Sequence, residues 1–115
     1  MHAVIAFVDP PRSDLAETRA KLRSDLEIRP ETPDLQSPVI VKDPITQRFY
    51  RFTWVQARVL RTLDGLRTPA AIAAMASKEC GTLVEPAQVE DFIVKLAGLL
   101  LLDDALSWSR LERAG

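Results

Sequence analysis

In the stretch DPITQRFYRF (residues 43–52), a turn signal leads into a segment in which arginines alternate with aromatic residues. Asp43 and Pro44 suit the first two positions of a β-turn, since aspartate supplies a hydrogen-bond acceptor there and proline has a fixed φ. The preceding residues, VIVKD (39–43), are rich in β-branched side chains, and QRFYRF (47–52) returns as a second arm. The sequence therefore predicts a β-hairpin.

The returning arm lacks the simple alternation of a strand that only covers a core. Because successive side chains of a strand point to opposite faces, Arg48, Tyr50 and Phe52 fall on one side. Phe49 and Arg51 fall on the other side. Two interpretations of this arm stay open. The arginines could guard an exposed strand edge, or the edge could accept a visiting peptide as an additional strand.

The rest of the chain supplies one more strand and a set of helices. DLEIR (25–29) alternates apolar and polar residues and predicts a first strand, and the prolines of residues 30–38 predict a loop. Beyond the hairpin the apolar period changes to about 3.6 residues. Capping residues, prolines and glycines there predict three short helices: residues 53–65, 68–81 and 85–98. We expect LLLLDD (99–104) to be a short buried strand or an extended tail, and the chain from Ala105 to be weakly helical.

A small sheet cannot bury its apolar face alone, so the helices must cover it. We therefore predict an α+β fold, in which a small three-stranded antiparallel sheet packs on three helices in a winged-helix-like arrangement. The length of 115 residues indicates one domain. We assign the domain to residues 21–104, a flexible or briefly helical arm to residues 1–20, and a tail to residues 105–115.

The charge of the chain is balanced overall and uneven locally. The net charge of −1 creates no global attraction to nucleic acid or to anionic lipid. Basic residues outnumber acidic ones from Lys42 to Arg67, and acidic residues outnumber basic ones from Thr68 to Asp104. We therefore expect two surfaces of opposite sign.

The residues that usually carry chemistry are scarce. His2 and Cys80 are the only histidine and cysteine, and together they cannot supply the ligands of a zinc site. The four glycines sit at helix ends or at the terminus, so there is no phosphate-binding loop. We predict a recognition module that is not an enzyme and that needs no cofactor and no metal. A lone thiol, and the lack of the roughly 20 apolar residues of a membrane span, predict a soluble cytoplasmic chain without membrane insertion.

Four segments carry a resemblance when taken together: LRSDLEIRP, VIVKDPITQRFYRFT, LRTLDGLRTPAAIAAMA and KLAGLLLLDD. Their order and spacing resemble the PqqD-like domain, a winged-helix module also called the RiPP recognition element. The resemblance covers residues from about 21 to 104. It is strongest to the version at the N-terminus of site-2-protease-like peptide metalloproteases and of HlyD-type secretion adaptors. This chain has no His-Glu-x-x-His motif and no membrane span, so an excised N-terminal domain and a stand-alone module both stay open.

The resemblance implies a function in peptide maturation. Domains of this family bind the leader segment of a precursor peptide and present it to a modifying enzyme, a peptidase or a transporter. The leader adds to the edge of the third strand, beside the third helix. Carried onto this chain, the peptide-binding residues are Arg48, Phe49, Tyr50, Arg51 and Phe52 on the strand and Val89, Phe92, Lys95 and Leu96 on the helix. An open strand edge also makes a homodimer through that edge an expectation.

Three further hypotheses stay open. The domain could be a scaffold without leader binding, in which case we expect the strand edge to be covered within the chain, for example by residues 13–24. A winged helix could bind DNA, but the acidic third helix would repel phosphate, so we expect no nucleic acid partner. Trp54, Arg58 and Arg61 share one face of the first predicted helix. They predict either a half-buried tryptophan beneath arginine stems or a stripe that binds a partner.

Overall fold

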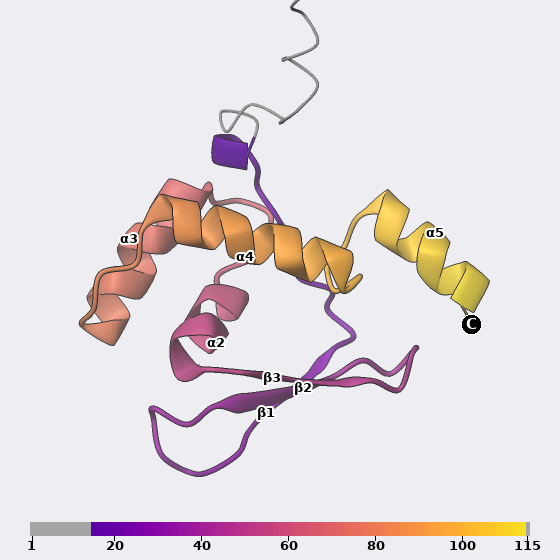
Figure 1. Ribbon diagram of the computed structural model, residues 1–115, viewed down its shortest axis with the longest axis horizontal. Helices are drawn as coiled ribbons and strands as arrows, with labels where there is room; N and C mark the ends of the chain where they lie inside the picture. Colours follow the sequence, from indigo (N-terminus) through magenta and orange to yellow (C-terminus); the bar gives the residue numbers. More distant parts are fainter. Residues whose placement is uncertain (1–14, 115) are drawn as a thin grey trace, which may run out of the picture.

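The computed structural model describes residues 15–114. Its strands are β1 (Glu27–Pro30), β2 (Val39–Lys42) and β3 (Phe49–Phe52), which form a three-stranded antiparallel sheet in the order β1-β2-β3. Its helices are α2 (Trp54–Arg61), α3 (Pro69–Cys80), α4 (Pro86–Gly98) and α5 (Ala105–Ala114). Figure 1 shows α2, α3 and α4 together on one side of the sheet, with α5 beyond the end of α4. The predicted α+β fold is confirmed.

The hairpin turn forms as its sequence predicts. The Oδ1 atom of Asp43 accepts hydrogen bonds from the backbone N–H of Ile45 at 2.9 Å and of Thr46 at 3.3 Å. Gln47 adopts a left-handed φ of 64°, and its N–H bonds the carbonyl of Asp43 at 2.8 Å. Because Gln47 closes the turn, β3 begins at Phe49 and is shorter than the predicted arm.

The helices begin at the residues that the capping signals predict, but one helix ends earlier than predicted. Thr53 accepts from the N–H of Gln56 at 3.2 Å, and the Gln56 side chain accepts from the N–H of Thr53 at 3.0 Å, which is a capping box. Pro69 starts α3 after the cap Thr68, and Gly81 ends it with a left-handed φ of 67°.

One predicted helix end was wrong. We expected the first helix to reach residue 65, but α2 ends at Arg61. The residues beyond it form hydrogen bonds with the N-terminal segment: Leu63 accepts from the N–H of Leu22 at 2.9 Å, and Gly65 donates to the carbonyl of Ala20 at 3.0 Å. These pairings take residues 63–65 out of the helical path, so the helix ends before them.

The core lies between the sheet and the helices. Val41 and Phe52 of the sheet meet Leu60, Ile72 and Leu96 of the helices, and all of these side chains are buried. Burial of this apolar surface is the main force that holds the two layers together.

The residues after α4 complete the core and lead into a last helix. Leu101 and Leu102 are buried, and Leu102 forms an isolated bridge with Leu22. The predicted buried strand is therefore present only at Leu101 and Leu102, because Leu99 and Leu100 form a turn and Asp103 and Asp104 are exposed. The segment from Ala105, predicted to be weakly helical, forms α5, and the side chain of Asp104 caps that helix by accepting from the N–H of Ser107 at 2.7 Å.

Candidate functional site

The outer edge of β3 has unpaired backbone groups. The N–H of Asp43 bonds the carbonyl of Arg48 at 2.9 Å, and hydrogen-bonded pairs alternate along an antiparallel ladder. With the observed register, Tyr50 and Phe52 therefore bond β2, while the N–H and C=O of Phe49 and Arg51 point away from it. Within residues 15–114, β3 pairs only with β2. A visiting strand can thus reach one donor and one acceptor on each of two residues.

The N-terminal segment does not cover this edge in the described part of the chain. Lys21 bridges Asp64, and Leu22 bridges Leu102. Residues 13–14 of the predicted covering segment lie outside the described residues. The intramolecular cover that the scaffold hypothesis predicted is therefore not formed by residues 15–24.

The two faces of β3 have different surroundings. Tyr50 is half-buried and Phe52 is buried, so this face meets the helices. Phe49 is 64% exposed on the outer face, where Lys42 lies with its Nζ 5.8 Å from the centre of the Phe49 ring. Arg51, on the same outer face, forms an ion pair with Glu31. The outer face of β3, which carries Phe49 and Arg51, is therefore exposed to solvent.

Two separate hollows lie near the hairpin, α2 and α4. One hollow of about 380 Å³ includes Arg48, Tyr50 and Leu99 in its lining; we call it the Tyr50 hollow. Another has a volume of about 220 Å³, and its lining includes Val55 and Phe92; we call it the Phe92 hollow. The start of β3 thus lies beside the end of α4, whereas the Phe92 hollow lies between α2 and the first half of α4.

Phe92 of the Phe92 hollow also contacts the end of β3. The rings of Phe52 and Phe92 meet edge to face, with centroids 5.6 Å apart and an interplanar angle of 83°. The Nζ atom of Lys95, an exposed residue, lies 6.0 Å from the centre of the Phe52 ring. We call the two hollows and this contact together the β3–α4 groove. Arg48 lines the Tyr50 hollow, and the exposed Lys95 lies beside the Phe52 ring.

The structure brings most of the predicted site residues to this groove, in different roles. Arg48 and Tyr50 line the Tyr50 hollow, and Val89 and Phe92 line the Phe92 hollow. Leu96 is fully buried in the core and lines neither hollow. The side chains of Phe49 and Arg51 lie on the outer face of the sheet, so only their backbone groups belong to the groove side.

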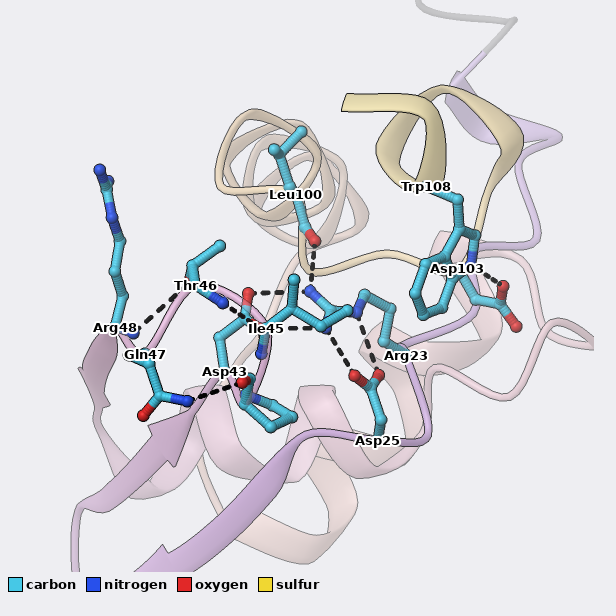
Figure 2. A network of polar contacts seen from close by, with 11 residues as sticks. Arg23, Asp25, Asp43, Ile45, Thr46, Gln47, Arg48, Leu100, Asp103 and Trp108 are labelled. Carbon is cyan, nitrogen blue, oxygen red and sulfur yellow. Dashed lines mark hydrogen bonds and ion pairs between the residues drawn. The ribbon is translucent and has the colours of Figure 1, made fainter. Parts of the chain in front are cut away.

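A buried polar network fixes the Tyr50 end of the groove (Figure 2). Arg23 donates to both carboxylate oxygens of Asp43, at 2.8 and 3.0 Å, and both side chains are fully buried. It also donates to Asp25 at 2.6 and 3.0 Å and to the carbonyl of Leu100 at 3.0 Å. Its guanidinium lies 5.0 Å from the ring of Trp108 on α5. One arginine thus connects the hairpin turn, the end of α4 and α5.

The network stabilises both charges in the interior. Burial alone would lower the pKa of Arg23, but the hydrogen bonds and charges of Asp43 and Asp25 outweigh it and raise that pKa. Burial alone would raise the pKa of Asp43. The hydrogen bonds from Arg23 and from the N–H groups of Ile45 and Thr46 outweigh this effect and lower it. The pair therefore stays ionised and holds the turn in place.

Sequence reasoning assigned Asp43 to the turn and did not single out Arg23. The sequence holds one local indication of this network: Arg23 stands two residues before Asp25, which can form an ion pair with it. Its burial follows from the meeting of three segments that are distant in sequence. It is a positioning residue for the groove and does not line either hollow.

Two further residues with potential chemistry are Cys80 and His2. Cys80 is half-buried, and burial raises the pKa of its thiol, which disfavours the reactive thiolate. His2 lies outside the described residues. In residues 15–114, histidine, cysteine and acidic side chains form no group that could hold a metal ion. None of the described helices is long and apolar enough to cross a membrane.

The fold and the hollows define a small winged-helix-like α+β domain with an unpaired strand edge. Comparison of the chain with family models, with curated proteins and with solved structures finds no match. The resemblance to the PqqD-like domain therefore stays a prediction from the sequence.

Proposed function

We propose that this domain is a non-catalytic reader of an extended peptide segment, which it binds as a fourth strand on β3. The proposal is carried by the unpaired edge of β3, with the Tyr50 hollow at the start of that strand. Backbone hydrogen bonds to Phe49 and Arg51 would supply affinity, and the two hollows would select side chains.

The lining of the groove favours a particular peptide chemistry. Tyr50, Leu99 and Phe92 offer apolar surface, which suits large apolar side chains. The charged groups of Arg48 and Lys95 form no ion pair with a residue of the described range, so each is available to a carboxylate. The preferred ligand is an extended segment that combines bulky apolar residues with one or two acidic ones.

The leader segment of a precursor peptide, delivered to a processing, modifying or export partner, fits this chemistry and the family resemblance. A domain that holds the leader needs no catalytic group of its own, because the partner acts on another part of the same peptide. The single thiol suits the reducing conditions of the cytoplasm.

The test removes the backbone N–H of Arg51, which points away from β2, and keeps the hydrogen bonds between β2 and β3. Arg51→Pro removes one donor that faces solvent, and proline is tolerated at such positions of edge strands. Arg51→Ala is the matched control, because it loses the same side chain and the same ion pair with Glu31 but keeps the N–H. The probes are synthetic leader segments of precursor peptides encoded near this gene, titrated by calorimetry.

We expect Arg51→Pro to weaken binding about tenfold or more, since the hydrogen bond is lost and the adjoining strand is displaced. Arg51→Ala should bind much as the unchanged protein does. Equal affinity of the proline and alanine variants, in a folded protein, would rule out strand addition at β3.

A further inference from the structure

A separate concave surface lies between α2 and the loop that joins β1 to β2. It has a volume of about 230 Å³; α2 contributes Trp54, Arg58 and Arg61, and the loop contributes Leu35. We call it the α2 hollow. It shares no lining residue with the Tyr50 hollow or with the Phe92 hollow. The α2 hollow is therefore a surface distinct from the β3–α4 groove.

The side chains of the α2 hollow offer hydrogen-bond donors that lack acceptors. Within residues 15–114, the guanidinium groups of Arg58 and Arg61 and the indole N–H of Trp54 form no hydrogen bond or ion pair. Asp34 is the carboxylate among the lining residues, and its Oδ1 accepts from the backbone N–H of Gln36 at 3.0 Å. The lining thus holds two arginines and one aspartate, which is engaged in its own loop, so the hollow carries a surplus of positive charge.

The same surface exposes apolar groups beside these donors. Leu35 is 84% exposed at the rim, and Trp54 is only half-buried. Tryptophan and arginine around a pocket are the residues that dominate binding energy in protein interfaces. A tryptophan that served only the core would normally be covered and would have its N–H bonded.

We propose that the α2 hollow docks an acidic segment of a partner protein. Carboxylates of that segment pair with Arg58 and Arg61, whose planar guanidinium groups suit bidentate contacts. An apolar side chain of the partner packs between Leu35 and Trp54. Charge complementarity selects an acidic partner locally, since the net charge of the whole chain is −1 and gives no general attraction.

This inference does not rest on the peptide-reading proposal. Because the two surfaces use different residues, the domain can hold a partner at α2 and leave the edge of β3 free. A module of this kind can keep its partner bound while peptides exchange.

The test is an NMR titration of isotope-labelled protein with a synthetic peptide of aspartate and glutamate around one leucine, capped at both ends. A matched probe replaces each acidic residue with asparagine or glutamine. Trp54 and Trp108 are the two tryptophans, so their indole N–H signals report separately on the hollow and on the Arg23 network. We expect the acidic probe, and not the neutral probe, to shift the Trp54 signal. The affinity for the acidic probe should fall as salt is added.

Variants at matched helix positions make the test specific. Arg61 and Arg113 are exposed arginines in the last turns of α2 and α5. We expect Arg61→Glu to weaken binding of the acidic probe about tenfold or more, and Arg113→Glu to leave it unchanged. Arg61→Gln should weaken binding by a smaller factor and avoids placing an acid at a helix C-terminus. Arg51→Pro should bind the acidic probe normally.

Four outcomes would overturn the inference. The first is no shift of the Trp54 signal, or an equal shift with the neutral probe. The second is binding that Arg61→Glu and Arg61→Gln leave intact. The third is a Trp54 signal that moves with protein concentration alone, because the hollow would then be occupied by a second copy. The fourth is tighter binding of a short DNA duplex at the same surface, which would make the partner a nucleic acid.

Discussion

Replacing Asp43 with asparagine tests whether the buried ion pair holds the hairpin against the end of α4. Both side chains are 0% exposed, and Arg23 reaches Asp43 through two hydrogen bonds of 2.8 and 3.0 Å. Removing one partner of a buried pair costs about 3–5 kcal/mol, because the other charge stays uncompensated in the interior. Asp25 still contacts Arg23 in the variant, so we expect the low end, about 3 kcal/mol.

The assay is urea unfolding followed by tryptophan fluorescence. Trp108 lies 5.0 Å from the Arg23 guanidinium and should report its loss. The stability of a small domain is about 5–15 kcal/mol, so the expected loss is a large share of it. At a urea dependence of about 1–3 kcal/mol per molar, the midpoint should fall by about 1–3 M.

Two comparisons separate the ion pair from a general effect of mutation. Glu31→Gln breaks the pair with Arg51, whose side chain is 64% exposed, and should cost less than about 1 kcal/mol. Arg23→Met combined with Asp43→Asn should recover part of the loss, since no unpaired charge then remains in the interior. Two results would contradict a stabilising ion pair: a cost of Asp43→Asn no larger than that of Glu31→Gln, or a double variant whose cost is the simple sum of the two single costs.

Two further predictions concern acid stability and the aromatic contact in the groove. The folded state lowers the pKa of Asp43, so its stabilisation is present above the ordinary value of about 3.9 and is lost as the pH falls through the lower folded value. As the pH is lowered below about 5, the free energy of unfolding should therefore fall more steeply for the unchanged protein than for Asp43→Asn. Parallel curves of this free energy against pH would contradict the prediction. Phe92→Ala removes the ring that meets Phe52 and should cost about 3–5 kcal/mol by calorimetry, whereas Phe92→Leu should cost less than about 1.5 kcal/mol. A loss below about 1 kcal/mol for alanine would mean that the ring is not packed.

The local features of the fold were readable because each depends on neighbours in sequence. Asp43 and Pro44 specify the turn, Thr53 caps α2, and Gly81 ends α3, and all of these contacts form within a few residues. The end of α2 was not readable, since residues 20–22 arrive from elsewhere in the chain to pair with the backbone after Arg61.

The candidate site divides in the same way. Alternation along β3 correctly separated Phe49 and Arg51 from Tyr50 and Phe52, because the side-chain period of a strand is fixed by backbone geometry. Alternation could not say which face meets the helices, or that Leu96 is too deeply buried to line the groove.

The sequence by itself determined the order of strands and helices, the position of the hairpin and the scarcity of catalytic side chains. Only the tertiary structure decided that the end of α4 lies beside the start of β3 and that Arg23 is buried between the hairpin and the last helices. The physical reason is the distance along the chain over which each interaction acts. Capping and turn contacts act over a few residues, whereas a groove and a buried ion pair exist only where distant segments meet and exclude water.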